Sequence, residues 1–289
     1  MRSEKNIVDL LLSTAKDDQR IRAVVLSGSR ADPGIPKDPF QDFDIVYLVT
    51  DPAPFSRNFD WIKRFGELMI LQTPEDMGDP PGENDGSYSY LMQFQDGNRI
   101  DLGIVPIAGK DKVLADDPHR VLLDKDGVFA DAAKPAAPGW QRPPTARQFD
   151  DCCNEFWWVC SYAAKGLWRD EPAYAKRMME AHVRDQLIRM LGWHVGIKSG
   201  FTKNPGKFGR FLEKHLDPGL WDSLMKTYVG VDDESVWQAL FRMTELFRQA
   251  ANEVADRLGY QYPKGDDERV SAHLRHVKGL PGDAKEIYP

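Results

Sequence analysis

The sequence predicts an α+β protein of two domains, with a mixed sheet and helices in residues 1–138 and a helical bundle in residues 139–289. Short apolar runs bounded by turn residues fill the first half, a pattern typical of strands. Long stretches with apolar side chains at helical spacing fill the second half. Between them, residues 131–144 are rich in proline and alanine, which is typical of a domain boundary.

The first half begins with a helix and continues as strands. Apolar side chains recur at helical spacing in residues 4–16. Five apolar runs follow, and we predict a strand for each of them: 21–26, 43–49, 65–71, 87–94 and 99–106. An Asp-Gly pair separates the last two runs, in the segment QDGN, and such a pair between apolar runs predicts a hairpin.

The second half has clear helix boundaries. Thr145 is placed as an N-cap with Gln148 at the capping-box position, so we predict that a helix begins there. The clearest helix is 235–258, with an apolar stripe along one face and Gly259 as its stop. The segment after Tyr260 is charged and punctuated by proline and glycine, and we expect it to be loosely attached.

Composition limits the classes of function. The chain has 289 residues, of which 42% are hydrophobic and 29% charged, as in soluble globular proteins. Its net charge of -7 disfavours a nucleic-acid partner and favours cationic small molecules. We find no signal peptide and no apolar run of membrane-spanning length. The three cysteines lack C-x-x-C spacing, so we expect reduced thiols in a cytoplasmic protein.

Two aspartates begin the second predicted strand. Asp42 and Asp44 lie two positions apart, so their side chains point to the same face of a strand, about 6.6 Å apart by the rise per residue. Asp101 lies in the returning strand of the hairpin and could face the same point. Converging carboxylates repel one another unless a cation lies between them, and Mg²⁺ prefers few carboxylates together with phosphate oxygens and water. These three residues are therefore candidate metal ligands.

A Gly-Ser turn precedes these aspartates. Gly28 lets the backbone approach an anion closely, and Ser29 adds a hydroxyl to successive backbone N–H groups. Arg30 follows as a further candidate phosphate contact. A Gly-Ser turn and a D-x-D at a strand start are each commonplace. Together with a third aspartate on a later strand, they favour a nucleotidyl-transfer site.

The combined pattern resembles the signature of the nucleotidyltransferase superfamily, which has a polymerase-β-like fold. The matching features are Gly-Ser in GSR, a spacer of about a dozen residues, and Asp-x-Asp in QDFDI. More narrowly, the chain resembles the aminoglycoside 6-adenylyltransferases, which modify streptomycin. That resemblance covers nearly the whole chain and weakens after about residue 265. Among its segments are IRAVVLSGSR, FQDFDIVYLV, FQDGNRIDLGIVPI and AKGLWRDE.

The resemblance implies an activity and the roles of five residues. The activity is the transfer of AMP from ATP to a hydroxyl of streptomycin, namely the 6-hydroxyl, with release of pyrophosphate and with Mg²⁺, which confers antibiotic resistance. By position, Gly28 and Ser29 would hold the triphosphate, and Asp42 and Asp44 would bind the metal. Asp101 would be a third metal ligand, the base that takes the hydroxyl proton, or both.

The helical half offers further candidate contacts to the triphosphate. Lys165 and Arg169 lie four residues apart and could reach the triphosphate across a cleft between the domains. A solvated basic face explains the same spacing equally well. Lys207, in NPGKFGR, is a rival contact, although a lone lysine is more often a surface charge.

Streptomycin carries guanidinium groups, which favour carboxylates and aromatic faces as partners. The candidate contacts to it are the acidic residues of the segment TPEDM and part of the first helix of the second half: Glu75, Asp76, Glu155, Trp157 and Trp158. Aromatic residues at helical spacing belong more often to a core than to a binding site. We therefore regard the tryptophans as the weaker candidates.

Two alternative functions remain open at this point. The first keeps the reaction and changes the acceptor to another hydroxylated small molecule or to a protein hydroxyl. The second is a nucleotide-binding module without turnover, against which the intact Asp42, Asp44 and Asp101 argue. In each case we expect a monomer with neither a nucleic-acid nor a membrane partner.

Overall fold

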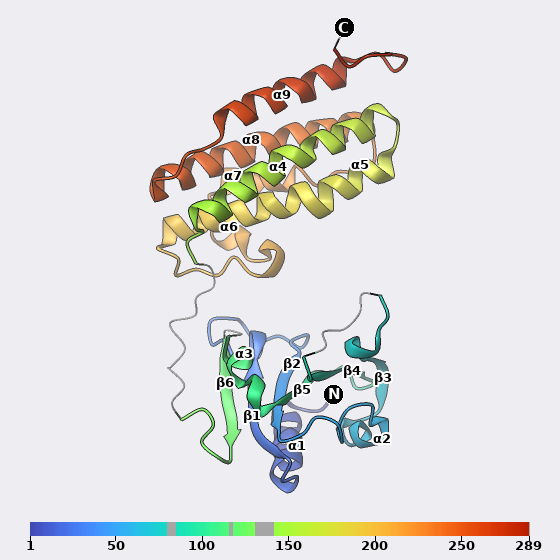
Figure 1. The fold of residues 1–289 in the computed structure, drawn as a ribbon, viewed down its shortest axis with the longest axis vertical. Coiled ribbons are helices and arrows are strands. Elements are labelled where there is room, and N and C mark those ends of the chain that lie inside the picture. The colour runs from blue at the N-terminus through green and yellow to red at the C-terminus, as the bar shows by residue number, and fades with distance from the viewer. Residues whose placement is uncertain (80–84, 116–117, 131–141, 289) are drawn as a thin grey trace. The chain divides into compact units, whose positions relative to one another are not determined.

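The computed structural model describes residues 1–79, 85–115, 118–130 and 142–288. The chain divides into two compact units, Met1–Pro138 and Gly139–Pro289, and each is taken by itself (Figure 1). The first unit contains a sheet with helices, and the second consists of helices, so the predicted α+β class is confirmed. Most of the predicted boundary segment, residues 131–141, lies outside the described residues.

The described residues of the first unit fold around a six-stranded mixed sheet of order β3-β4-β5-β2-β1-β6. β2 and β5 are parallel, and the other neighbouring pairs are antiparallel. The strands are β1 Ile21–Ser27, β2 Phe43–Val49, β3 Leu68–Gln72, β4 Tyr88–Phe94, β5 Arg99–Pro106 and β6 His119–Asp124. The helices of this unit are α1 Glu4–Asp17, α2 Phe59–Ile62 and α3 Lys110–Ala115.

The sheet differs from its prediction at two strands. The apolar run 65–71 begins before its strand, because residues 63–65 form a 3₁₀ turn and Gly66 has a φ of 137°. β6 is not among the predicted strands, because its half-exposed residues do not form a compact apolar run. The hairpin between β4 and β5 is confirmed: the Phe94 amide donates to the Asn98 carbonyl at 2.9 Å, and Gly97 takes a φ of 85°.

The two faces of the sheet are covered differently. The larger core packs one face against α1 and α2, and its members include Ile7, Leu11, Trp61, Tyr47, Tyr90 and Ile104. A smaller cluster lies on the opposite face: Ala23, Val25, Leu48, Val113 and Phe129. Because side chains alternate along a strand, a single strand can contribute to both clusters. The less covered face also carries the acidic side chains of β2 and β5.

The second unit is a bundle around an apolar core. Its helices are α4 Ala146–Trp168, α5 Pro172–Met178, α6 Arg184–Ser199, α7 Pro218–Met225, α8 Asp233–Leu258 and α9 Lys264–Gly279, with a π-helical turn Met179–Val183 between α5 and α6. The rings of Phe156 and Phe247 stack at 3.7 Å between centroids and join α4 to α8. Apolar stripes on α4, α6 and α8 supply most of this core.

The predicted ends of α4 and α8 are confirmed. The Thr145 hydroxyl accepts a hydrogen bond from the Gln148 amide at 3.2 Å, and the Gln148 side chain accepts one from the Thr145 amide at 2.9 Å. This reciprocal pair is a capping box. Gly259 ends α8 in the left-handed conformation, with a φ of 73°.

The prediction of a loosely attached C-terminal segment is wrong, because α9 packs against α4. Leu274 is fully buried on α9, and Asp267 is only 4% exposed. The Asp267 carboxylate accepts two hydrogen bonds from Arg248, each at 2.5 Å, and one from Ser271 at 2.9 Å. Few positions of α9 are apolar, and its buried Asp267 is paired with Arg248 on α8. Local periodicity in the sequence does not reveal a pairing between two helices.

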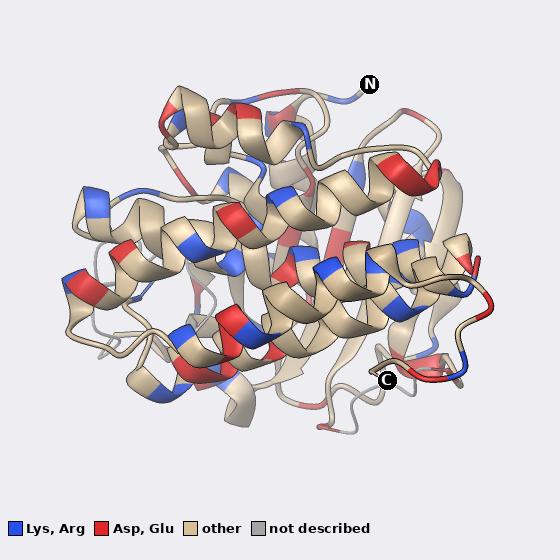
Figure 2. Cartoon of the chain, turned by 90° about the horizontal axis from the view of Figure 1, so that it is seen from above, with Lys and Arg blue, Asp and Glu red and all other residues tan. Residues whose placement is uncertain are grey.

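Charges of both signs are interspersed along the described helices of the bundle (Figure 2). None of the helices in the described part combines the length and the apolar character that a membrane crossing requires.

Glu253 on α8 gives a prediction about stability and pH. Its carboxylate lies 2.8 Å from Lys198 Nζ and 3.0 Å from His194 Nε2. The hydrogen bond from Lys198 is the main cause that lowers the Glu253 pKa from 4.5 to about 2. A lowered pKa stabilises the fold above the unfolded-state pKa, and this contribution is lost as the pH falls toward 2.

Glu253→Gln should therefore reduce the free energy of unfolding at pH 7 by about 1 kcal/mol, a value discounted because the carboxylate is partly exposed. The loss should shrink between pH 5 and pH 3, as followed by urea unfolding. Glu245→Gln on the same helix is the control, and it should have no comparable effect. A loss that is equally large at pH 3 and pH 7 would contradict the electrostatic explanation.

Candidate functional site

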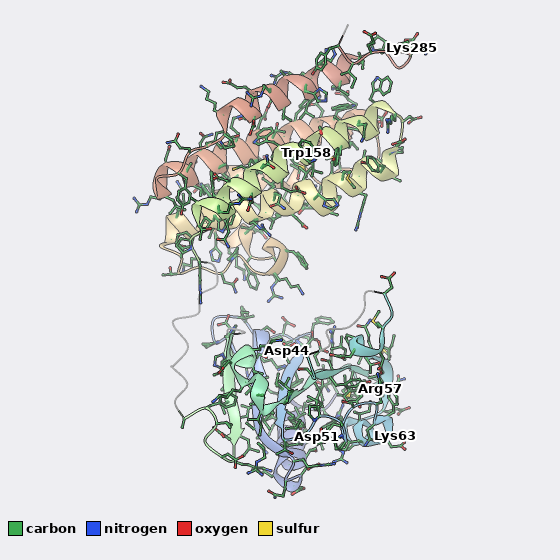
Figure 3. The ribbon with its side chains drawn as sticks, viewed as in Figure 1. Asp44, Asp51, Arg57, Lys63, Trp158 and Lys285 are labelled. Carbon is green, nitrogen blue, oxygen red and sulfur yellow. The ribbon has the colours of Figure 1, made fainter. Side chains whose placement is uncertain are left out.

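Two of the predicted aspartates share one face of the sheet because of the β2–β5 register. Asp44 is the second residue of β2, and it is paired with Asp101 on the parallel strand β5. Phe43 and Ile100, the residues before them, are buried in the larger core on the opposite face. Since side chains alternate, Asp44 and Asp101 point to the less covered face. Figure 3 shows Asp44 at one end of β2 and Asp51 beyond the other end.

Gly28 brings the Gly-Ser turn against Asp44. Ser27 is paired with Asp44 across β1 and β2, and Gly28 follows with a φ of 67°. A Cβ atom placed on Gly28 would lie 2.1 Å from Oδ2 of Asp44, closer than any real Cβ contact. A side chain at position 28 would therefore have to displace the Asp44 carboxylate, which favours glycine together with the positive φ. The turn predicted to hold phosphates and a carboxylate predicted to bind metal are direct neighbours.

Arg30 is a correction to the prediction. Its side chain is only 9% exposed, so its guanidinium is not presented to a triphosphate. Nε donates to the Asp42 carbonyl at 3.0 Å and Nη2 to the Gln41 carbonyl at 2.8 Å, while the guanidinium lies 3.9 Å from the centre of the Phe43 ring. These contacts fix the loop that carries Asp42. Arg30 is a positioning residue for this loop.

Sequence reasoning missed Arg99, which joins Asp101 to Asp42. Arg99 Nε and Nη2 donate to Oδ1 and Oδ2 of Asp101 at 2.8 and 2.6 Å. The same Nε lies 3.7 Å from Oδ2 of Asp42. The signal was present in the sequence, because residues 99 and 101 are two apart on a strand and must share a face. Arg99 thus links Asp101 to Asp42, while Asp44 shares a face with Asp101 through the strand register.

Burial is the main cause that raises the pKa of the Asp42 carboxyl. The positive charge of Arg99 opposes this shift, and the negative charge of Asp101 adds to it. The pKa of Arg99 is itself raised, first by its hydrogen bond to Asp101. The site therefore contains three acidic groups and one guanidinium, that of Arg99. The Asp42 carboxyl is partly desolvated. Because the acidic groups outnumber Arg99, the site favours a further cation.

The oxygen donors fit a hard divalent cation that arrives with a nucleotide. Within the described residues, no three His, Cys, Asp or Glu side chains are grouped so that they could hold a metal unaided. Both oxygens of Asp101 are engaged by Arg99. Mg²⁺ typically takes one or two carboxylates and completes its shell with phosphate oxygens and water. Asp42 and Asp44 are the residues that would supply those carboxylates.

Glu75 and Asp76 lie together in a 3₁₀ turn after β3 but have different partners. The Glu75 carboxylate accepts hydrogen bonds from the amide and hydroxyl of Ser89, both at 2.9 Å. Ser89 is paired with Gly103, two residues beyond Asp101 on β5. Glu75 is therefore bound on the same face of the sheet as the aspartates.

Asp76 is held by two hydrogen bonds within the fold, and its contact to a substrate stays a prediction. Its carboxylate accepts hydrogen bonds from the Tyr88 hydroxyl at 2.6 Å and from Arg57 Nε at 2.7 Å. The Tyr88 hydroxyl and then Arg57 lower the pKa of Asp76. Both of its oxygens are used within the fold.

Trp157 on α4 also corrects a prediction, because it is only 1% exposed and packs against Phe156 and Phe247 in the bundle core. It cannot contact a substrate there. Trp158 is 60% exposed, and its indole N–H donates to the Tyr162 hydroxyl at 3.0 Å (Figure 3). Glu155 lies half-buried on the same helix.

The predicted triphosphate contacts of the second half all belong to the helical unit. Lys165 and Arg169 line a pocket of about 370 Å³ between the end of α4, α9 and the segment that follows α9. Lys165 Nζ lies 4.8 Å from the centre of the Tyr162 ring. Lys207 lies in the segment after α6, 5.4 Å from the centre of the exposed Phe208 ring. The aspartates and the Gly-Ser turn belong to the sheet unit.

Gly28→Ala tests the close approach to Asp44. The left-handed φ alone costs an alanine about 1–2 kcal/mol, and here the new methyl group would also displace the Asp44 carboxylate. The control is Gly97→Ala, since Gly97 has a φ of 85° but a Cβ added there would meet no neighbouring atom within 4 Å. Denaturant unfolding should show a larger loss for Gly28→Ala than for Gly97→Ala. Equal losses would contradict the packing of Gly28 against Asp44.

Comparison with known proteins identifies the family of the chain. The family described as streptomycin adenylyltransferase matches residues 1–277. An aminoglycoside 6-adenylyltransferase of Campylobacter jejuni is 42% identical over 289 residues, covering 99% of this chain and 100% of the relative. Another, of Bacillus subtilis (strain 168), is 40% identical over 270 residues, covering 92% of this chain and 95% of the relative.

Among solved structures, the chain is similar to an aminoglycoside 6-adenyltransferase from Bacillus subtilis, with 36% identity, a TM-score of 0.49, and coverage of 97% of this chain and 100% of that chain. A nucleotidyltransferase-like protein from Exiguobacterium sibiricum matches with 12% identity, a TM-score of 0.39, and coverage of 89% and 78%. The family match and the two relatives span most or all of the chain. The protein belongs to the streptomycin adenylyltransferase family of nucleotidyltransferase enzymes.

Proposed function

We propose that this enzyme transfers AMP from ATP to the 6-hydroxyl of streptomycin, with release of pyrophosphate and with Mg²⁺. The observation that carries the proposal is the placement of the Gly28 turn directly against Asp44, with Asp42 and Asp101 joined through Arg99 beside it. The activity for which the two relatives are named, aminoglycoside 6-adenylylation, supports the same reaction. Carboxylates beside a small-residue turn suit a metal-bound triphosphate.

The Gly-Ser turn and two of the aspartates would bind MgATP. The backbone N–H groups around Gly28 and the Ser29 hydroxyl would hold phosphate oxygens. Asp42 and Asp44 would hold Mg²⁺, which supplies charge neutralisation at the transferring phosphoryl group. Arg30 and Gln41 keep the Asp42 loop in place, because Arg30 donates to two of its carbonyls and Gln41 Nε2 donates to the Ser29 carbonyl at 3.3 Å.

Asp101 is the residue that we propose takes the proton of the acceptor. An alcohol is a poor nucleophile at neutral pH, and a base whose acceptor atom lies within about 2.6–3.2 Å of the hydroxyl oxygen raises its reactivity. Arg99 takes one lone pair on each Asp101 oxygen, whereas a carboxylate offers about four acceptor sites. As the proton passes to Asp101, the acceptor oxygen bonds to the α-phosphorus and the bond to the bridging oxygen of pyrophosphate breaks.

The acidic face of the sheet suits a cationic acceptor. Glu75 is bound to Ser89 on the same face as Asp101, so the face carries a further carboxylate beyond the three aspartates. Guanidinium groups such as those of streptomycin bind carboxylates with paired hydrogen bonds. The net charge of -7 also favours the approach of a cation. Glu155 and the exposed Trp158 are our proposed acceptor contacts from the helical unit.

Three basic residues of the helical unit complete the proposal. Lys165 and Arg169 carry the charge needed to contact a triphosphate, and we propose them as its contacts from the helical unit, with Lys207 as the rival contact. We further propose that the enzyme acts as a monomer in the cytoplasm, where ATP is available. The three cysteines are buried free thiols, which suits a reducing compartment.

Mass spectrometry of streptomycin incubated with the protein, ATP and Mg²⁺ tests the reaction. We expect a product heavier by one AMP group, together with pyrophosphate, and a phosphorus–proton NMR coupling that places the group on the 6-hydroxyl. Aminoglycosides without the streptidine ring are the comparison acceptors. Modification of these, but not of streptomycin, would overturn the acceptor, and absence of pyrophosphate release with every acceptor would overturn the reaction.

Asp44→Asn tests the metal ligand. The amide keeps the size of the side chain but loses the charge that holds a divalent cation, so AMP transfer should fall by at least about a hundredfold while the melting temperature stays near that of the parent. Asp51→Asn, beyond the other end of β2, is the matched control and should retain activity (Figure 3). Retention of full activity by Asp44→Asn would remove Asp44 from the mechanism.

A further inference from the structure

We propose that Arg99 is a built-in counter-ion of the aspartate cluster that repels a divalent cation held by Asp42 and Asp44 and so weakens the binding of metal without nucleotide. This inference rests on the proposed function only in taking Mg²⁺ as the ligand of the cluster. It assigns Arg99 a role in positioning Asp101 and in tuning metal affinity.

The contacts of Arg99 are directed at the cluster. Two of its nitrogens bind the two oxygens of Asp101, at 2.8 and 2.6 Å, and Nε also approaches Asp42 at 3.7 Å. A guanidinium that binds both oxygens of a carboxylate fixes its plane as well as its position. The Asp101 side chain is 20% exposed and that of Arg99 is 40% exposed, so solvent screens this pairing only in part.

The charge of the cluster explains why a cation is built into it. Asp44 is paired in register with Asp101, and Asp42 lies within reach of the same guanidinium. Each of these three aspartates contributes to raising the pKa of Arg99, with the hydrogen bond to Asp101 as the largest cause. Without a cation, neighbouring carboxylates repel one another. Arg99 therefore holds the cluster together when no metal is bound.

The same contacts oppose a bare metal ion. A divalent cation held by Asp42 and Asp44 would lie near the Arg99 guanidinium, because Arg99 Nε is 3.7 Å from Oδ2 of Asp42, and this like charge lowers its affinity. The phosphates of a nucleotide bring the negative charge that offsets this repulsion. Arg99 thus favours the entry of metal together with nucleotide over the entry of metal alone.

Mn²⁺, a paramagnetic substitute for Mg²⁺, is the probe that tests this inference without any turnover. Binding of Mn²⁺ alone is measured by the loss of its free electron paramagnetic resonance signal, for the full chain and for Arg99→Met. Removal of the Arg99 charge should lower the dissociation constant of Mn²⁺ about tenfold, the factor that one pKa unit of charge interaction represents in an equilibrium constant. Arg99→Lys, which keeps the charge but not the paired hydrogen bonds, should lie between the two.

Arg22→Met is the matched control. Arg22 on β1 binds both oxygens of Asp126 in the same unit, at 2.6 Å for the Nε contact, but it lies outside the cluster. Its loss should leave Mn²⁺ affinity unchanged. Thermal unfolding in EDTA should show a lower melting temperature for Arg99→Met than for the parent, and Mn²⁺ should narrow this difference.

Equal or weaker Mn²⁺ binding by Arg99→Met and Arg99→Lys would overturn the inference, and so would absence of Mn²⁺ binding by the parent and both variants. Should Arg99→Met fail to fold, the Arg99→Lys comparison decides alone. The proposed function is judged separately, by formation of adenylylated streptomycin in the parent. Product formation combined with unchanged Mn²⁺ affinity in the variants would reject only the role of Arg99.

Discussion

Asp44 and Asp101 face the same side because β2 and β5 run parallel with these two residues in register. The register is held from the other face, where Phe43 and Ile100 are buried against the α1 side of the core. A slip of one residue in β5 would turn Asp101 toward that core and expose Ile100. The packing of apolar side chains on one face therefore decides which carboxylates can act together on the other.

Side-chain and backbone contacts hold the Gly28–Ser29 turn, the loop that carries Asp42, and Asp101 in place around β2. Glycine at position 28 lets the Gly-Ser turn lie directly against Asp44, because a Cβ there would displace the Asp44 carboxylate. Arg30 binds the backbone of the Asp42 loop, and Arg99 binds the side chain of Asp101. Two arginines thus position two acidic groups, one through the main chain and the other through the carboxylate itself.

Local patterns in the sequence were sufficient for the fold class, the hairpin and the ends of α4 and α8, because each depends on residues close in sequence. Strand alternation also indicated that Asp44 and Asp101 could share a face, as their register shows. The roles of Arg30 and Trp157 required tertiary structure, since a guanidinium bound to carbonyls and an indole in a core look in the sequence like ordinary binding residues. α9 was missed because its buried acid is neutralised from another helix.

The central claim is that the aspartate cluster beside Gly28 binds the metal and the triphosphate together. A crystal structure with Mn²⁺ and a non-hydrolysable ATP analogue tests it most directly, because anomalous scattering locates the metal without reference to any assumed site. We expect the anomalous peak to lie between Asp42 and Asp44, with phosphate oxygens at the Gly28–Ser29 turn. A peak that contacts neither aspartate, or a triphosphate bound away from this turn, would contradict the account.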